Sequence, residues 1–115
     1  MGHFRVPATL TGPAGRAETL DLLVDTGATF LIVPRRLAER LELVIQRMQT
    51  VQMAGGRRAD WPLAEIRVQV DGRDAPTVCL IAPEGNALLG AVALESLGMA
   101  VDPVGRRLIP VDALA

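Results

Sequence analysis

Hydrophobic and polar residues alternate along most of this chain in short runs, and turn-forming residues separate these runs. A period of two residues is typical of strands that have one buried face and one exposed face. The expected strands span residues 4–10, 16–24, 30–33, 44–53, 59–70, 74–82, 99–101 and 107–111. Glycine-containing turns lie between several neighbouring runs, including Gly55-Gly56 and Asp71-Gly72, as in β-hairpins. The pattern therefore predicts a mainly β fold with mostly antiparallel strands, either a barrel or a sandwich.

Two short stretches have the spacing of helices instead. Pro34 is suited to the start of a helix, and Leu37 and Leu41 follow one turn apart. A second helix is expected over residues 91–97, with Gly98 at its carboxyl end. We therefore expect a single domain over residues 1–115, with one or two short helices added to the strands.

Composition narrows the function. The 115 residues carry 12 Lys and Arg against 13 Asp and Glu, and only three aromatic residues, Phe4, Phe30 and Trp61. The balanced charge and the scarcity of stacking side chains argue against nucleic acid as a partner. Cys79 is the only cysteine, within an apolar strand pattern, and His3 is the only histidine, near the amino terminus. We therefore expect no disulfide, no metal site, no cofactor and no Cys–His or Ser–His catalytic pair.

Nothing in the sequence resembles a membrane anchor. No apolar run approaches the ~20 residues that a membrane-spanning helix needs, and the amino terminus has no signal-peptide pattern. The expectation is a cytoplasmic protein without a membrane partner.

One carboxylate stands out because apolar runs flank it on both sides. Asp25 begins the sequence Asp-Thr-Gly-Ala, with Leu22-Leu23-Val24 before it and Phe30 to Val33 soon after. Burying a lone ionised carboxylate between hydrophobic strands is costly unless a nearby group compensates for it. An ordinary turn would explain Asp-Thr-Gly alone, but not the apolar flanks.

Together with two later features, this motif resembles the retropepsin-like aspartic proteases, the single-domain relatives of pepsin. The later features are the Gly55-Gly56 hairpin and the sequence Leu88-Leu89-Gly90 before the second helix. The likeness spans nearly the whole chain and is closest to small bacterial members. It implies a closed antiparallel β-barrel of the retropepsin type and a polypeptide substrate.

The resemblance also implies a homodimer, because the chain has a single Asp-Thr-Gly and the chemistry needs two facing carboxyl groups. By this likeness Asp25 is the acid and base, Thr26 bonds across the dimer axis, and Gly27 lets the backbone approach the carboxylate. Ala28 stands where pepsin-like members have serine. Alanine cannot donate the hydrogen bond that a serine hydroxyl would give to the ionised carboxylate. This loss should extend activity toward neutral pH.

Further roles follow from the same likeness. The hairpin tip becomes a flap that closes over substrate. Leu88, Leu89 and Gly90 support the active-site loop from beneath, and residues 108–114 pair with the amino-terminal segment across the dimer. Trp61, at the base of the second arm of the hairpin, is either a core residue, which we favour, or part of the wall of the cleft. The residues expected to contact substrate are Ala28, Met53, Ala54, Gly55, Gly56 and Arg57.

Two other interpretations stay open. The first keeps the fold without the reaction, as a peptide-binding or dimerisation module. The second is an unrelated aliphatic β-barrel in which Asp25 merely lies in a turn.

Overall fold

The first hairpin shows how the alternating pattern becomes structure. In the computed structural model, which describes residues 3–115, β1 (Arg5–Thr11) pairs antiparallel with β2 (Ala17–Val24) along their whole length. Alternate residues of β1 are buried, and Leu22 and Val24 of β2 join them in the core. The predicted hairpin is confirmed, and β2 ends where Asp25 begins.

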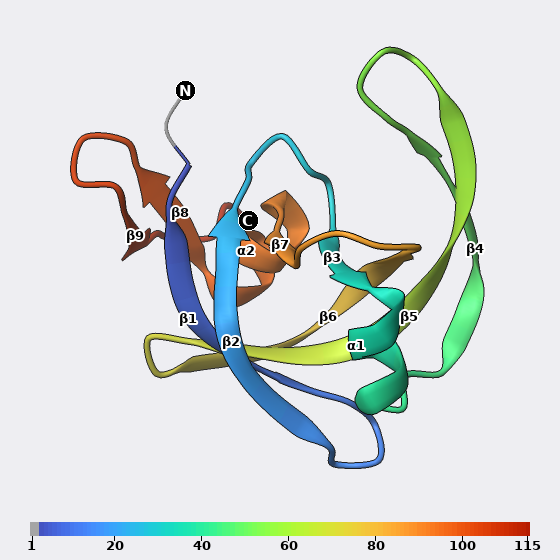
Figure 1. Cartoon of the computed structure of the whole chain (residues 1–115). Coiled ribbons are helices and arrows are strands. Elements are labelled where there is room, and N and C mark those ends of the chain that lie inside the picture. Colours follow the sequence, from blue (N-terminus) through green and yellow to red (C-terminus); the bar gives the residue numbers. More distant parts are fainter. Residues whose placement is uncertain (1–2) are drawn as a thin grey trace.

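A three-stranded meander over residues 45–82 crosses the molecule, and its first hairpin lies on the side away from β1 and β2 (Figure 1). β4 (Ile45–Gln52) pairs with β5 (Arg58–Val70), which pairs with β6 (Arg73–Ala82), all antiparallel. Asp71 and Gly72 join β5 to β6 with φ of 50° and 77°, the positive values that a two-residue hairpin turn requires. Both hairpins were predicted from their turn residues.

The remaining pairings connect strands that are distant in the sequence. The sheet runs in the order β1-β2-β7-β3-β6-β5-β4, with β3 at Leu31–Pro34 and β7 at Leu88–Leu89. A further pairing between β1 and β5 closes six strands into a ring and leaves β4 at an outer edge. The β2–β7 and β3–β6 pairs are parallel, which the mostly antiparallel prediction did not include, because only non-local contacts create them.

Both predicted helices are present. α1 (Arg35–Arg40) begins directly after Pro34 and buries Leu37 and Ala38. α2 (Ala91–Leu97) packs mainly against β6 and ends at Gly98, whose φ of 67° is the left-handed conformation common at helix ends.

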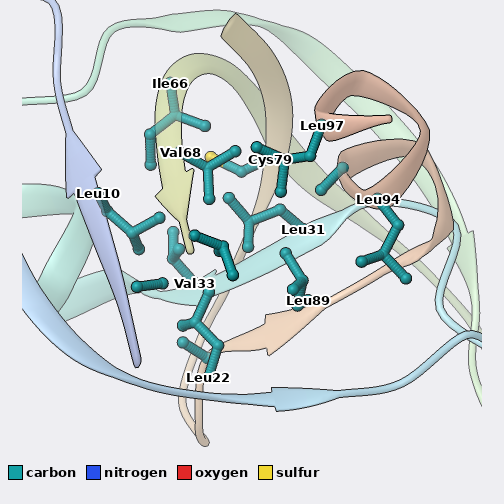
Figure 2. Packing of buried hydrophobic residues seen from close by; sticks show 14 of the residues in the cluster. Leu10, Leu22, Leu31, Val33, Ile66, Val68, Cys79, Leu89, Leu94 and Leu97 are labelled. Carbon is teal, nitrogen blue, oxygen red and sulfur yellow. The ribbon is translucent and has the colours of Figure 1, made fainter. Parts of the chain in front are cut away.

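The core is aliphatic (Figure 2). Its fully buried side chains include Leu10, Leu22, Leu31, Leu89, Val33, Val68 and Cys79. Fully burying one leucine contributes roughly 1.5–3 kcal/mol. Burial raises the pKa of the Cys79 thiol to about 12, so this side chain remains a neutral core residue, as expected.

A separate hairpin completes the chain. β8 (Met99–Asp102) pairs only with β9 (Arg107–Pro110), beside the start of β1 (Figure 1). The Val111 N–H donates to the Gly98 carbonyl at 2.9 Å, which ties the end of β9 to the end of α2. Within the described part of the chain, neither helix has the length and apolar character needed to cross a membrane.

Candidate active site

The Asp25 carboxylate lies at the start of the loop between β2 and β3, at the edge of the core. The Asp25 N–H donates to the Leu89 carbonyl at 3.0 Å, which continues the β2–β7 pairing by one residue. The Gly27 N–H donates to Asp25 Oδ1 at 3.0 Å. The side chain remains 29% exposed, so the carboxylate is held by its own loop while one side stays open to solvent.

The beginning of α2 braces this loop from beneath. The first N–H groups of a helix have no partner within the helix. Here the Ala91 and Val92 N–H groups donate to the carbonyls of Ala28 and Thr29, both at 2.8 Å. Gly90 makes this approach possible, because an added Cβ would lie 2.7 Å from the Ala28 carbonyl oxygen and closer still to that of Phe30. Gly90 therefore supports the loop through its lack of a side chain.

A cleft of about 770 Å³ opens on one side of Asp25, toward the β4–β5 hairpin. Of the residues expected to contact substrate, Ala28, Met53 and Ala54 line this cleft. Gly55, Gly56 and Arg57 do not line it and lie at the hairpin tip. The residues that sequence reasoning did not identify come mainly from β3, β4 and the loop after Asp25. They are Thr29, Phe30, Ile32, Gln49, Thr50, Val51, Gln52 and Leu80.

Two apolar residues occupy other positions than expected. Trp61 is half-buried and lines the cleft, so the favoured core position is wrong and the alternative position in the cleft wall is the one observed. Leu88 and Leu89 were both expected beneath the loop. Successive residues of a strand point to opposite faces, so Leu89 is fully buried while Leu88 lines the cleft.

A second hollow, of about 660 Å³, opens on the other side of the loop, toward the β8–β9 hairpin. The exposed Thr26 and the buried Val24 border it from the loop and β2. Its other lining residues are His3, Phe4, Val101, Pro103 and Arg106. The Asp-Thr-Gly sequence thus separates two hollows, with Asp25 and Gly27 on the cleft side and Thr26 on the other.

His3 lies close to the carboxylate, which the sequence reasoning missed. Its Nε2 atom is 4.0 Å from Asp25 Oδ1. The antiparallel register pairs Arg5 with Leu23, so residues just before β1 lie level with residues just after β2. The proximity follows from the register in which β1 and β2 pair, and the alternating sequence pattern alone does not determine that register.

Side-chain hydrogen bonds fasten the β8–β9 turn. Asp102 Oδ1 accepts from the Val104 and Gly105 N–H groups at 3.1 and 3.2 Å, and Arg107 Nε lies 3.3 Å from Asp102 Oδ2. The Gly105 N–H bond, followed by the Arg107 and Val104 contacts, lowers the pKa of the Asp102 carboxyl from its usual 3.8. This hairpin forms a fixed wall of the second hollow.

Across residues 3–115, no three His, Cys, Asp or Glu side chains gather in the way that metal ligands do.

Comparisons with known proteins identify the fold and the family. The structure of EIAV protease, complexed with the inhibitor HBY-793, matches with a TM-score of 0.66 and 21% sequence identity. The match covers 84% of this chain and 89% of that one, and it shows the retropepsin fold. A search of curated proteins returned no match. A family model described as aspartyl protease matches residues 6–101, and the chain therefore belongs to the aspartyl protease family.

Proposed function

We propose that this protein is an aspartic endopeptidase whose active site forms between two copies of the chain. The observation that carries the proposal is the Asp25 carboxylate at the edge of an open cleft. Among residues 3–115, no other carboxylate lines the cleft or the second hollow beside it. Since the chemistry of the family needs two facing carboxyl groups, the second Asp25 comes from a partner subunit.

In the proposed dimer, the two Asp25 carboxyls lie about 3 Å apart and share one proton, because both cannot be ionised at that distance. The ionised carboxylate removes a proton from a water molecule, whose oxygen attacks the amide carbon. The protonated carboxyl donates its proton to the carbonyl oxygen. The carboxyl that took the proton from water then gives it to the amide nitrogen as the C–N bond breaks. The other carboxylate takes a hydroxyl proton from the tetrahedral intermediate, which restores the shared proton.

Exposed apolar groups support a dimer face beside Thr26. The second hollow there is lined by apolar side chains such as Val101 and Pro103. Val111 and Leu114, after β9, are 45% and 98% exposed, so both apolar side chains are accessible to a partner. A twofold interface that includes the chain ends would cover them and bring the Thr26 residues toward the axis.

The cleft is suited to an extended polypeptide. Phe30, Ile32, Trp61 and Leu88 give it apolar walls, which favours apolar side chains next to the cleaved bond. Gly55 and Gly56, with φ of 87° and 84°, form a hairpin tip beside the cleft. We propose that this tip closes over the substrate and that Met53 to Arg57 contact its main chain.

The test compares the wild-type protein with Asp25→Asn on a mixture of unfolded, apolar-rich peptides near pH 5. The matched control is Asp21→Asn, an exposed residue of β2 outside the cleft. We expect cleavage by the wild type and by Asp21→Asn, its inhibition by pepstatin, and a loss of at least a thousandfold in Asp25→Asn. Equal cleavage by wild type and Asp25→Asn would refute the protease assignment.

No cleavage by any of the three proteins, at concentrations where sedimentation shows a dimer, would favour a peptide-binding module on the same fold. A strictly monomeric protein at high concentration would contradict the shared active site.

A further inference from the structure

The cleft beside Asp25 carries almost no charge. Among the described residues, Asp25 is the one charged residue that lines it, and its polar lining residues, such as Gln49 and Thr50, are neutral. Charges at the border of such a cleft therefore have a large part in selecting the polypeptides that bind there. Arg47 lies at this border, two residues before Gln49 in β4.

The register of three strands places Arg47 on the cleft face of the sheet. Arg47 pairs with Leu63 of β5, and Leu63 pairs with Leu80 of β6. Paired residues have their side chains on one face, and Leu80 lines the cleft. Gln49 also lines the cleft, and residues two apart in a strand point to the same face. The Arg47 side chain is thus on the cleft face, just beyond the residues that line the cleft.

Hydrogen bonds hold the Arg47 guanidinium beside the cleft without neutralising it. Its Nη1 group donates to the Gln49 side-chain oxygen and to the Met48 carbonyl, the latter at 3.3 Å. Gln49 Nε2 in turn donates to the Thr50 carbonyl at 3.0 Å. Over residues 3–115, no carboxylate lies within 4.0 Å of this guanidinium. Its Nε–H and Nη2–H groups are therefore available to a carboxylate of a bound molecule.

Two other charges of this hairpin lie on the opposite face. Arg58 and Asp60 come three residues and one residue before Trp61 in β5. These odd spacings place them on the face opposite to Trp61, which lines the cleft. The Asp60 carboxylate accepts a hydrogen bond from the Thr50 hydroxyl at 2.8 Å. Of Arg47 and Arg58, only Arg47 is therefore on the cleft face, and Arg58 provides a control with the same charge.

We propose that Arg47 determines specificity by binding an acidic side chain of the substrate, several residues from the cleaved bond. The inference rests on the proposed function, and it narrows the substrate to polypeptides in which Asp or Glu flanks an apolar segment. β4 is the outer edge strand of the sheet, so an extended polypeptide in the cleft has room to continue beside it. The fork of an arginine side chain binds carboxylates in a bidentate way. Because Arg47 is exposed, the preference should be about two- to fivefold.

The first test measures binding and needs no enzymatic activity. Two synthetic peptides share an apolar centre that is flanked on both sides either by glutamates or by glutamines. Trp61 is the only tryptophan and lines the cleft, so its fluorescence in Asp25→Asn reports binding. At about pH 7, where glutamate is ionised, the glutamate peptide should bind about two- to fivefold more tightly than the glutamine peptide.

Arg47→Gln in the same background should remove this preference, Arg47→Lys should retain part of it, and Arg58→Gln should leave it in place. Higher salt should weaken it, because the contact is exposed. A ratio of the two affinities that is the same with and without Arg47→Gln would overturn the inference. Failure of both peptides to bind would contradict the cleft as a polypeptide site, and the inference with it.

The second test measures kcat/KM for cleavage of the glutamate peptide and of a matched lysine peptide. Arg47→Glu should reverse the preference, with a change of roughly tenfold in the ratio of the two kcat/KM values, chiefly through KM. Arg58→Glu is the control and should change this ratio little. The same ratio in wild type and Arg47→Glu would overturn the inference. A wild type that binds the glutamate peptide more tightly but cleaves neither peptide would refute the proposed protease while leaving the role of Arg47 in binding established.

Discussion

Two hairpins stand on opposite sides of Asp25, and they are fastened in different ways. At the β8–β9 turn, the Asp102 carboxylate accepts two backbone N–H bonds and contacts Arg107, while Arg106 reaches across to His3. At the β4–β5 tip, the hydrogen bonds among the described residues are backbone bonds: the Met53 N–H donates to the Arg57 carbonyl at 2.7 Å, and the Gly56 N–H donates to the Met53 carbonyl at 3.0 Å. An added Cβ at Gly55 or Gly56 would meet no atom within 4 Å.

The difference shows that two β-hairpins in one molecule can be held to different degrees and can therefore suit different roles. A tip with few contacts can move at little free-energy cost, which suits a cover over a substrate cleft. A turn held by side-chain bonds keeps its shape, which suits the proposed role of this hairpin at a dimer interface. We therefore expect changes in the first hairpin to alter activity and changes in the second to alter stability and assembly.

The largest expected effect is at Gly90, which lies against the loop that follows Asp25. Gly90→Ala places a methyl group against the Ala28 and Phe30 carbonyls, so the loop or α2 has to shift. We expect the free energy of unfolding to fall by about 2–4 kcal/mol, measured by urea denaturation.

The control for this variant is Gly27→Ala, whose added Cβ would meet only Asp25 Oδ1, at 3.2 Å. It should unfold close to the wild type even if activity falls. Equal stability of Gly90→Ala and wild type would show that Gly90 is not closely packed against the Ala28 and Phe30 carbonyls.

The next largest effect is expected at the β8–β9 turn, which side-chain hydrogen bonds hold in place. Asp102→Ala removes the carboxylate that holds the β8–β9 turn, so we expect a lower melting temperature and weaker dimerisation by sedimentation. The pKa of Asp102 is lowered in the folded protein, so its contribution to stability is present above the usual 3.8 and is lost as pH falls through the lower, folded value.

The difference in melting temperature between wild type and Asp102→Ala should therefore shrink as the pH is lowered below 3.8. A difference that stays constant over this range would mean that the carboxylate does not fasten the turn.

The β4–β5 tip should respond in the opposite way, with a larger effect on activity than on stability. Gly55→Ala and Gly56→Ala place a side chain where φ is 87° and 84°, which is unfavourable but local to an open tip. We expect kcat/KM to fall roughly three- to tenfold while the melting temperature changes little. A large loss of stability with unchanged kinetics would reverse the comparison between the two hairpins.

The smallest effect is expected at Ala28, which lines the cleft beside Asp25. Ala28→Ser offers a hydroxyl to the ionised carboxylate, so the acid limit of the pH profile should move down by about half a pH unit. Ala28→Gly, which adds no hydroxyl, is the control. An unmoved limit in Ala28→Ser would contradict the assigned role of this position.

Local patterns predicted the fold well where neighbouring segments pair. The hairpins around residues 12–16 and 71–72, and the helix that ends at Gly98, follow from turn residues and periodicity. The parallel pairs of β2 with β7 and of β3 with β6 join segments more than 40 residues apart, and no local pattern encodes them.

The sequence predicted the reactive group of the site, the Asp25 carboxylate, but not all of the residues that surround it. The apolar flanks of Asp25 marked the carboxylate, and Gly90 proved to have a steric reason for its place. The choice between core and cleft wall for Trp61 could not be made from the sequence, because an aromatic residue is suited to both positions. His3 was missed because its distance from Asp25 depends on the hairpin register.

The central claim, that Asp25 is competent only as a pair, is tested most directly by mixing subunits. Wild-type protein is equilibrated with a tenfold excess of Asp25→Asn, and cleavage is measured while sedimentation confirms that mixed dimers form. The account predicts that activity falls roughly tenfold, because nearly every wild-type subunit then faces an asparagine. Undiminished activity in the presence of mixed dimers would show that one Asp25 is sufficient, and would contradict the account.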